Sequence, residues 1–229
     1  NLDSVMLGFM ATNADVGYYG AAVKIKNILV SIVTSLGTVL LPRAAYYIEH
    51  QQMDEFKKLS RKALNFVFII ASPMMIYFML FAKQGIYFLS GDAFGPAVVP
   101  MQLIMPTLLL IGITNILGIQ ILVPLGYEKA VLVSEIVGAI IDLVVNALLI
   151  PVYQSSGAAI GTLLAEFAVM VVQCIALKNE IKTAFSDIKY LKIILAIILA
   201  SLASYWVVAL NLHVFITLVI SAILFFGVY

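Results

Sequence analysis

The sequence predicts an all-α fold, a polytopic bundle of transmembrane helices, and three observations support this prediction. Of the 229 residues, 63% are hydrophobic and only 11% are charged, whereas a soluble domain carries about 25% charged residues. The mean hydropathy of +1.11 points the same way. Apolar runs of about 20 residues, the length that crosses a bilayer, follow one another between charged and turn residues. We therefore expect a multi-pass membrane protein.

Seven complete spans and one shorter helix are expected along the chain. The opening stretch NLDSVMLGFMAT is apolar but too short to cross a bilayer, so we interpret it as the end of a helix whose beginning is missing. Turn residues, among them Pro124 to Gly126 and Pro151 to Gly157, separate the apolar runs. The expected spans are Val16–Tyr46, Ala63–Ala82, Val98–Leu122, Ala130–Ile150, Ala158–Leu177, Tyr190–Leu210 and Val214–Tyr229.

No linker divides the chain, so we expect residues 1–229 to form a single transmembrane domain. Residues 1–177 are expected to form a core lobe. Residues 178–229 are expected to form a cytoplasmic linker and two additional helices.

The distribution of basic residues predicts the orientation of these spans. Ten Lys and Arg residues lie in the segments 43–62, 129 and 178–192, and only Lys83 lies in the intervening loops. Because cytoplasmic loops carry the excess of basic residues, we expect these three segments on the cytoplasmic side.

Several classes of function have little support in the sequence. A formal net charge of +1 without a basic face argues against nucleic-acid binding. The one cysteine, Cys174, lies in an apolar run, and the two histidines, His50 and His213, lie in loops without a neighbouring nucleophile. There is no phosphate-binding GxxxxGK[ST] motif and no cluster with metal-ligand spacing. We therefore expect no enzyme activity, no catalytic residue, no metal and no cofactor.

Two lysines in the first complete span are the most unusual charges, because an ionisable group at the bilayer centre costs at least about 2.5–3.5 kcal/mol. Lys24 and Lys26 point about 200° apart around a helix. Lys26 continues into apolar or small residues, and we expect it to extend to the interface or to pair with a neighbouring helix. Lys24, about 12 Å deep, is expected to face a wet cavity, with extension to the outer interface as the alternative. Lys24 continues into a polar stripe of Asn27, Ser31, Thr34 or Ser35, and Thr38.

Other intramembrane polar groups fall on two later helices. Glu135, Asp142 and Asn146 lie within about 40° of one helix face. Thr162, Glu166 and Gln173 form a similar line on the next helix. Two interpretations remain open for Asp142 and Glu166, namely interhelical hydrogen bonds and a site that couples transport to a proton or another cation. The GxxxG motif from Gly157 to Gly161 is interpreted as close helix packing.

Several longer stretches occur together in an order and spacing that resembles the C-terminal half of bacterial Wzx-type polysaccharide-biosynthesis flippases. These belong to the multidrug/oligosaccharidyl-lipid/polysaccharide exporter superfamily. The resemblance runs from residue 1 to about residue 166. The stretches are LDSVMLGFM, DVGYYGAAVKIKNILVSIVTSLGTVLLPR, LSGDAFGPAVVPMQLI, GIQILVPLGYEKA and VVNALLIPVYQSSGAAIGTLLAE.

The resemblance implies the C-terminal lobe of a two-lobed transporter that works by alternating access around a central cavity. The helix with Asp3 and the helix with Lys24 would correspond to the seventh and eighth helices of the family, which line that cavity. Lys24, Asn27, Asp3 and Ser31 are therefore our candidates for substrate binding. Glu135, Asp142, Asn146 and Glu166 are the candidates for coupling or for polar contacts between helices.

The implied substrate is an undecaprenyl-diphosphate-linked oligosaccharide, moved across the bacterial cytoplasmic (inner) membrane for O-antigen or capsule synthesis. The implied partners are membrane lipids, the missing N-terminal lobe of the same chain, a polysaccharide polymerase and glycosyltransferases, and no nucleic acid. Three alternatives remain open: a cation-coupled multidrug antiporter, a flippase for peptidoglycan lipid precursors, and a membrane scaffold for glycan enzymes.

Overall fold

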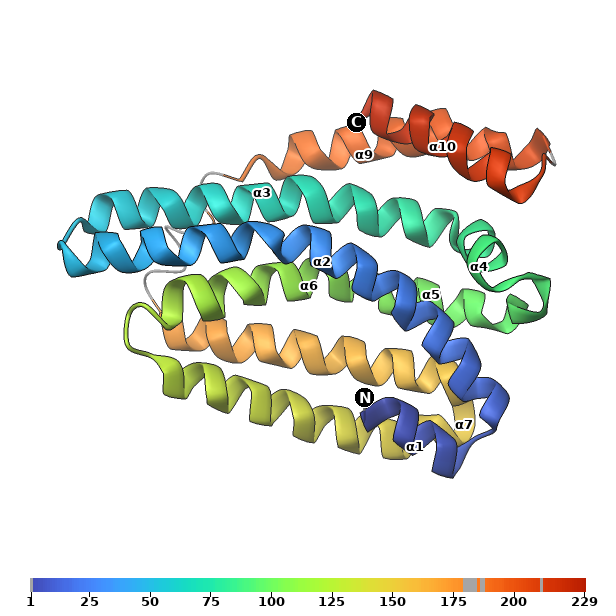
Figure 1. The fold of residues 1–229 in the computed structure, drawn as a ribbon, viewed down its shortest axis with the longest axis horizontal. Helices are drawn as coiled ribbons and strands as arrows, with labels where there is room; N and C mark the ends of the chain where they lie inside the picture. Colours follow the sequence, from blue (N-terminus) through green and yellow to red (C-terminus); the bar gives the residue numbers. More distant parts are fainter. Residues whose placement is uncertain (1, 179–184, 186–187, 211) are drawn as a thin grey trace.

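The computed structural model describes residues 2–178, 185, 188–210 and 212–229, and most of these residues lie in long helices packed side by side (Figure 1). The described residues contain no β-strand, which confirms the predicted all-α class. In chain order, the helices are α1 (Leu2–Met10), α2 (Asn13–Glu49), α3 (Met53–Leu80), α4 (Ala82–Ser90), the 3-10 helix η1 (Asp92–Ala97), α5 (Val98–Ile104), α6 (Thr107–Thr114), the π-helix η2 (Asn115–Leu122), α7 (Glu128–Leu177), α9 (Tyr190–Tyr205), the 3-10 helix η3 (Trp206–Leu210) and α10 (Val214–Val228).

The lengths and compositions of these helices agree with a multi-pass membrane protein. α2, α3, α7 and the continuous stretch of α9 and η3 are each long and apolar enough to cross a membrane. The segment from Asp92 to Leu122 provides a fifth candidate span, bent by 42° where α5 meets α6. The bend lies at Pro106, which has no backbone N–H to continue the helix hydrogen bonds.

α7 is a hairpin of two antiparallel arms (Figure 1). The chain reverses at Gln154, whose φ of 52° and ψ of −128° are not helical. The two arms can approach closely because a Cβ atom on Gly157 would lie 2.5 Å from the carbonyl oxygen of Leu149. The predicted turn between two spans is thus confirmed, and the first glycine of the GxxxG motif packs against the other arm of the same hairpin.

α2 begins at a reciprocal cap that the sequence Thr12-Asn13-Ala14-Asp15 provides. The backbone N–H of Asp15 donates to the Thr12 hydroxyl at 3.2 Å, and the backbone N–H of Thr12 donates to the Asp15 carboxylate at 3.2 Å. Two donors at the helix start are satisfied in this way. The cap fixes where the chain turns from α1 into the long helix that carries both lysines.

The ends of the helices place the basic segments together. The turn between α2 and α3, the start of α7 and the end of α7 lie at one end of the bundle, and α4 lies at the opposite end (Figure 1). The first three segments are those expected on the cytoplasmic side, so the helix directions agree with the charge pattern. We refer below to these as the basic end and the opposite end.

Two apolar cores hold the helices together. The larger core joins α1 to α7 and contains buried residues such as Leu7, Leu64 and Leu108. The smaller core lies where α9 and α10 pack on α3, around Tyr77 and Phe225. The division into a core lobe and two additional helices stays a prediction, because the larger core also includes Ile188.

Candidate functional site

A pocket of about 290 Å³ lies between α1, α2 and the two arms of α7. We call it the carboxylate pocket, because acidic side chains dominate its polar lining. Four carboxylates and one lysine line it, so negative groups outnumber positive ones among these residues. The polar lining residues are Asp3, Tyr19, Lys26, Glu135, Asp142, Thr162 and Glu166.

Asp3 lies at the centre of the hydrogen bonds in this pocket. The Tyr19 hydroxyl donates to Asp3 Oδ2 at 2.5 Å, and Asn146 Nδ2 donates to Asp3 Oδ1 at 2.8 Å. Thr162 Oγ1 lies 3.3 Å from Asp3 Oδ2 and 2.8 Å from the Tyr19 hydroxyl. Donors from α2 and from both arms of α7 thus meet one buried carboxylate of α1, which stabilises its charge away from water.

Asn146 and Asp142 are seated over a glycine of the opposite arm. A Cβ atom on Gly161 would lie 2.1 Å from Asn146 Oδ1 and 3.3 Å from Asp142 Oδ1. Both of these oxygens are buried and have no hydrogen-bond partner among the described residues. The second glycine of the GxxxG motif therefore makes room for two polar side chains, of which Asp142 lines the pocket.

Lys26 lies on the side of α2 that faces the carboxylate pocket. Its side chain is half-buried and interacts electrostatically with Glu166 and Asp3. Nearby negative charge offsets the cost of holding an ammonium group in a membrane helix. Of the two expectations for Lys26, pairing with a neighbouring helix is the one that this position supports.

Lys24 lies on the other side of α2 and is exposed, as are Asn27 and Ser31. The Ser31 hydroxyl donates to the Ile28 carbonyl oxygen of its own helix at 2.7 Å. These three residues belong to the expected polar stripe, but the cavity found beside α2 is lined by Lys26 rather than by Lys24. We expected Lys24 to face a cavity and Lys26 to face away from it, whereas in this part of the molecule Lys26 lines the cavity. A role of the stripe in substrate binding stays a prediction.

The structure brings together most of the other predicted polar residues. Glu135, Asp142 and Glu166 line the carboxylate pocket, and Asn146 contributes its hydrogen bond to Asp3. The candidate residue Asp3 also lines this pocket, which Lys24 does not. The sequence analysis did not single out Tyr19, although it precedes Lys26 by two helical turns and so lies on the same face of α2.

A second pocket of about 200 Å³ adjoins the first one. Glu135 and Glu166 line both pockets. We call the second one the amide pocket, because Asn115 from η2 and Gln173 from α7 line it, together with Thr114. Gln173 Nε2 donates to Ser134 Oγ at 3.2 Å, which joins the two arms of α7 near the basic end.

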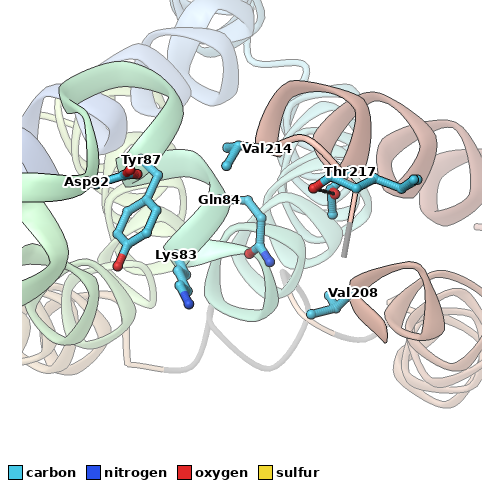
Figure 2. Close-up of a pocket in the computed structure, with 8 residues that line it drawn as sticks. Lys83, Gln84, Tyr87, Asp92, Val208, Val214 and Thr217 are labelled. Carbon is cyan, nitrogen blue, oxygen red and sulfur yellow. Dashed lines mark hydrogen bonds between the residues drawn. The ribbon is translucent and has the colours of Figure 1, made fainter. Parts of the chain in front are cut away.

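A separate pocket of about 370 Å³ lies at the opposite end, between α4 and α10 (Figure 2). Lys83, Tyr87 and Asp92 line one side of it and Thr217 the other. The Lys83 ammonium lies 5.4 Å from the centre of the Tyr87 ring, within the range of a cation–π contact. None of the predicted site residues line this pocket, so we do not assign the candidate function to it.

Among the described residues, no group of three or more His, Cys, Asp or Glu side chains is arranged to hold a metal ion. The polar groups that meet at the carboxylate pocket are carboxylates, hydroxyls and one ammonium, and the Asn146 amide reaches Asp3 from beside them.

Comparison with known proteins shows what the chain is similar to. A family model described as polysaccharide biosynthesis protein matches residues 1–99. An uncharacterized membrane protein of Methanocaldococcus jannaschii is 26% identical over 229 residues, which are all of this chain and 45% of that protein.

Two further relatives carry functional names. A protein of Escherichia coli, named provisionally as an O-antigen transporter, is 24% identical over 77% of this chain and 42% of its own length. A protein of Haloferax volcanii, named provisionally as a flippase, is 22% identical over 80% of this chain and 38% of its own length. The chain thus spans less than half the length of these curated relatives. The family model and these relatives agree in what they indicate: the chain is similar to polysaccharide-biosynthesis membrane proteins of the flippase type.

Proposed function

We propose that this chain forms one lobe of a flippase that moves a lipid-linked oligosaccharide across the bacterial cytoplasmic membrane by alternating access. The names of two relatives support transport of this kind. The proposed carrier lipid is undecaprenyl diphosphate, and the proposed products are building blocks of a cell-surface polysaccharide. Because this chain covers less than half of the length of each relative, a second lobe would complete the central cavity.

The exposure of Lys24 is the observation that carries this proposal. Lys24 lies 11 residues after the start of α2, or about 16 Å along a helix that rises 1.5 Å per residue. An exposed ammonium at this depth is expensive in lipid unless it meets water or an anion. A diphosphate that crosses a medium of low dielectric constant needs a fixed positive charge, and the neighbouring Asn27 and Ser31 add hydrogen-bonding groups.

We further propose that the carboxylate pocket couples this transport to a cation. Asp3 is held by three donors, whereas one oxygen of Asp142 has no partner among the described residues. A group with free bonding capacity beside a fixed charge can take up and release a proton or a small metal cation. Lys26 would then modulate the charge of this pocket and would have no direct part in binding the cargo.

The experiment is export of surface polysaccharide by cells that carry variants of the full-length protein. We expect Lys24→Leu to abolish export and Lys24→Arg to retain part of it, because arginine keeps the positive charge. Lys26→Leu is the matched comparison, since it removes a lysine from the same helix on the side of the carboxylate pocket. It is expected to weaken export less and to change its dependence on the ion gradient. Normal export by Lys24→Leu would refute the proposed contact with the lipid carrier.

A cation-coupled drug antiporter is the second candidate, and the acidic lining of the carboxylate pocket favours it. Deletion of the gene separates the two. Loss of surface polysaccharide with unchanged drug sensitivity supports the flippase, and changed drug sensitivity with intact polysaccharide supports the antiporter. A peptidoglycan-precursor flippase would be essential for growth. A scaffold for glycan enzymes would tolerate neutralisation of all the intramembrane charges.

A further inference from the structure

Several buried side-chain oxygens of this lobe have unused hydrogen-bonding capacity. Five side-chain oxygens are buried without a hydrogen-bond partner among the described residues, and the four amide oxygens among them can only accept hydrogen bonds. They belong to Asn115, Gln120, Asp142, Asn146 and Gln173. Each such group costs about 1–3 kcal/mol when it stays unpaired. Five unpaired oxygens in one lobe therefore indicate a bound hydrogen-bond donor or cation.

Glycines make room for these side chains. A Cβ atom on Gly118 would lie 3.0 Å from Gln173 Nε2. A Cβ atom on Gly37 would lie 2.6 Å from Asn115 Oδ1 and 2.7 Å from Gln120 Nε2. Together with Gly161, which lies against Asn146 and Asp142, a glycine therefore faces each of the five side chains. A larger residue at these points would displace the polar group.

The carboxylate pocket and the amide pocket adjoin each other, and the amide pocket lies toward the basic end. The two pockets share Glu135 and Glu166, so their linings meet. Gln173 lies four residues before the end of α7, or about 6 Å along the helix. Its side chain is 1% exposed and lines the amide pocket with an unpartnered oxygen. The facing helix is the π-helix η2, a form that is frequent at functional sites.

We infer that the amide pocket holds water and a small monovalent cation, and that it connects the carboxylate pocket with the cytoplasm inside this lobe. The ligand is a proton carried by water or a sodium ion, since both bind to neutral and acidic oxygens. The purpose of the path rests on the proposed coupling role of the carboxylate pocket. The existence of the path does not rest on that role, because the buried amides, the glycines and the adjoining pockets support it independently.

Two threonines of α6 provide a test of this path that needs no transport. Thr114 lines the amide pocket, whereas Thr107 is fully buried in the core and its hydroxyl donates to the Ile104 carbonyl oxygen at 2.6 Å. In the full-length protein with Cys174→Ser and without other cysteines, Thr114→Cys and Thr107→Cys are treated separately with a small cationic thiosulfonate in detergent. Because only a hydrated thiol ionises readily, we expect Thr114→Cys to react at least about tenfold faster.

Equal reaction after unfolding in sodium dodecyl sulfate confirms that both thiols are intact, and thermal unfolding confirms that both variants fold. A slow reaction of Thr114→Cys, at the rate of Thr107→Cys, would overturn the inference. So would a fast reaction of both, since this would indicate general opening of the helix bundle.

Gln173→Met identifies the cation and separates this inference from the proposed function. The change keeps the length of the side chain and removes its amide. In vesicles, substrate transport is driven by an inward Na⁺ gradient at uniform pH, or by an inward proton gradient in Na⁺-free medium. We expect Gln173→Met to lose severalfold of the rate under one of the two gradients and to keep its rate without a gradient. Full stimulation of Gln173→Met under both gradients would overturn the path, whereas no transport by the unmodified protein would overturn the proposed function instead.

Discussion

Gly161 in one arm of α7 lies against Asn146 in the other arm, so closely that a Cβ atom on residue 161 would be 2.1 Å from Asn146 Oδ1. This contact holds Asn146, which is 0% exposed, where its amide can donate to Asp3. The shape of the α7 hairpin and the hydrogen bonds of the carboxylate pocket therefore depend on the same residue.

Gly161→Ala is expected to destabilise the protein and to displace Asn146 from Asp3. Overpacking of a tight contact costs about 1–3 kcal/mol. The midpoint of thermal unfolding of the purified full-length protein measures this loss. Gly227→Ala is the control, because a Cβ atom there meets nothing within 4 Å. An equal midpoint for both variants would show that Asn146 has room to move.

Asp142→Asn is expected to leave stability almost unchanged while removing the stimulation of transport by an ion gradient. Asparagine has the same shape as aspartate, and its amide can pair with neighbouring oxygens, but it carries no exchangeable charge. Transport in vesicles with and without a gradient measures the effect. If Asp142 serves only as a hydrogen-bonding group between helices, the gradient will stimulate the variant as before.

Thr12→Ala is expected to loosen the first turn of α2. The change removes the hydroxyl that accepts from the Asp15 backbone N–H, and loss of such a cap costs about 1 kcal/mol. Faster hydrogen exchange of the Asp15 amide is the direct measurement. Asn13→Ala, one residue into the helix, is the control and should leave that amide protected.

Tyr77→Phe is expected to weaken the attachment of α10 to α3. The Tyr77 hydroxyl donates to the Leu218 carbonyl oxygen at 2.9 Å and lies 3.0 Å from Ser221 Oγ. Phenylalanine keeps the ring contacts with Phe81 and Phe225 but loses these hydrogen bonds, at a cost of about 1 kcal/mol. Thermal unfolding measures the change. Tyr205→Phe, at an exposed tyrosine, should leave the midpoint where it is.

The helices could be predicted from the sequence because apolar length and turn residues act locally. The predicted break from Pro151 to Gly157 contains the reversal at Gln154, and the polar residues Glu135 and Asp142 do lie on one side of their helix facing a common pocket. These features follow from the composition and the periodicity of single segments.

The environment of the two lysines could not be predicted in the same way. A polar stripe identifies the face of α2 with the most polar residues, but the packed face is mostly apolar and carries one lysine. Lys26 is accommodated there because carboxylates from α1 and α7 lie opposite. The carboxylates of α7 are more than a hundred residues from Lys26 in the sequence. Only tertiary packing reveals such a pairing, although the spacing of Tyr19 and Lys26 marks one face of the helix.

Lys24 and Lys26 are two residues apart on one uninterrupted helix, and they face opposite sides of it. Any rotation of α2 about its long axis must therefore swing both ammonium groups at once, one relative to the acidic lining and the other on the exposed side. No loop or hinge separates the two lysines, so a rotation of the helix moves both of them together. The angle through which α2 turns would then set how far cargo recognition and ion occupancy can vary independently.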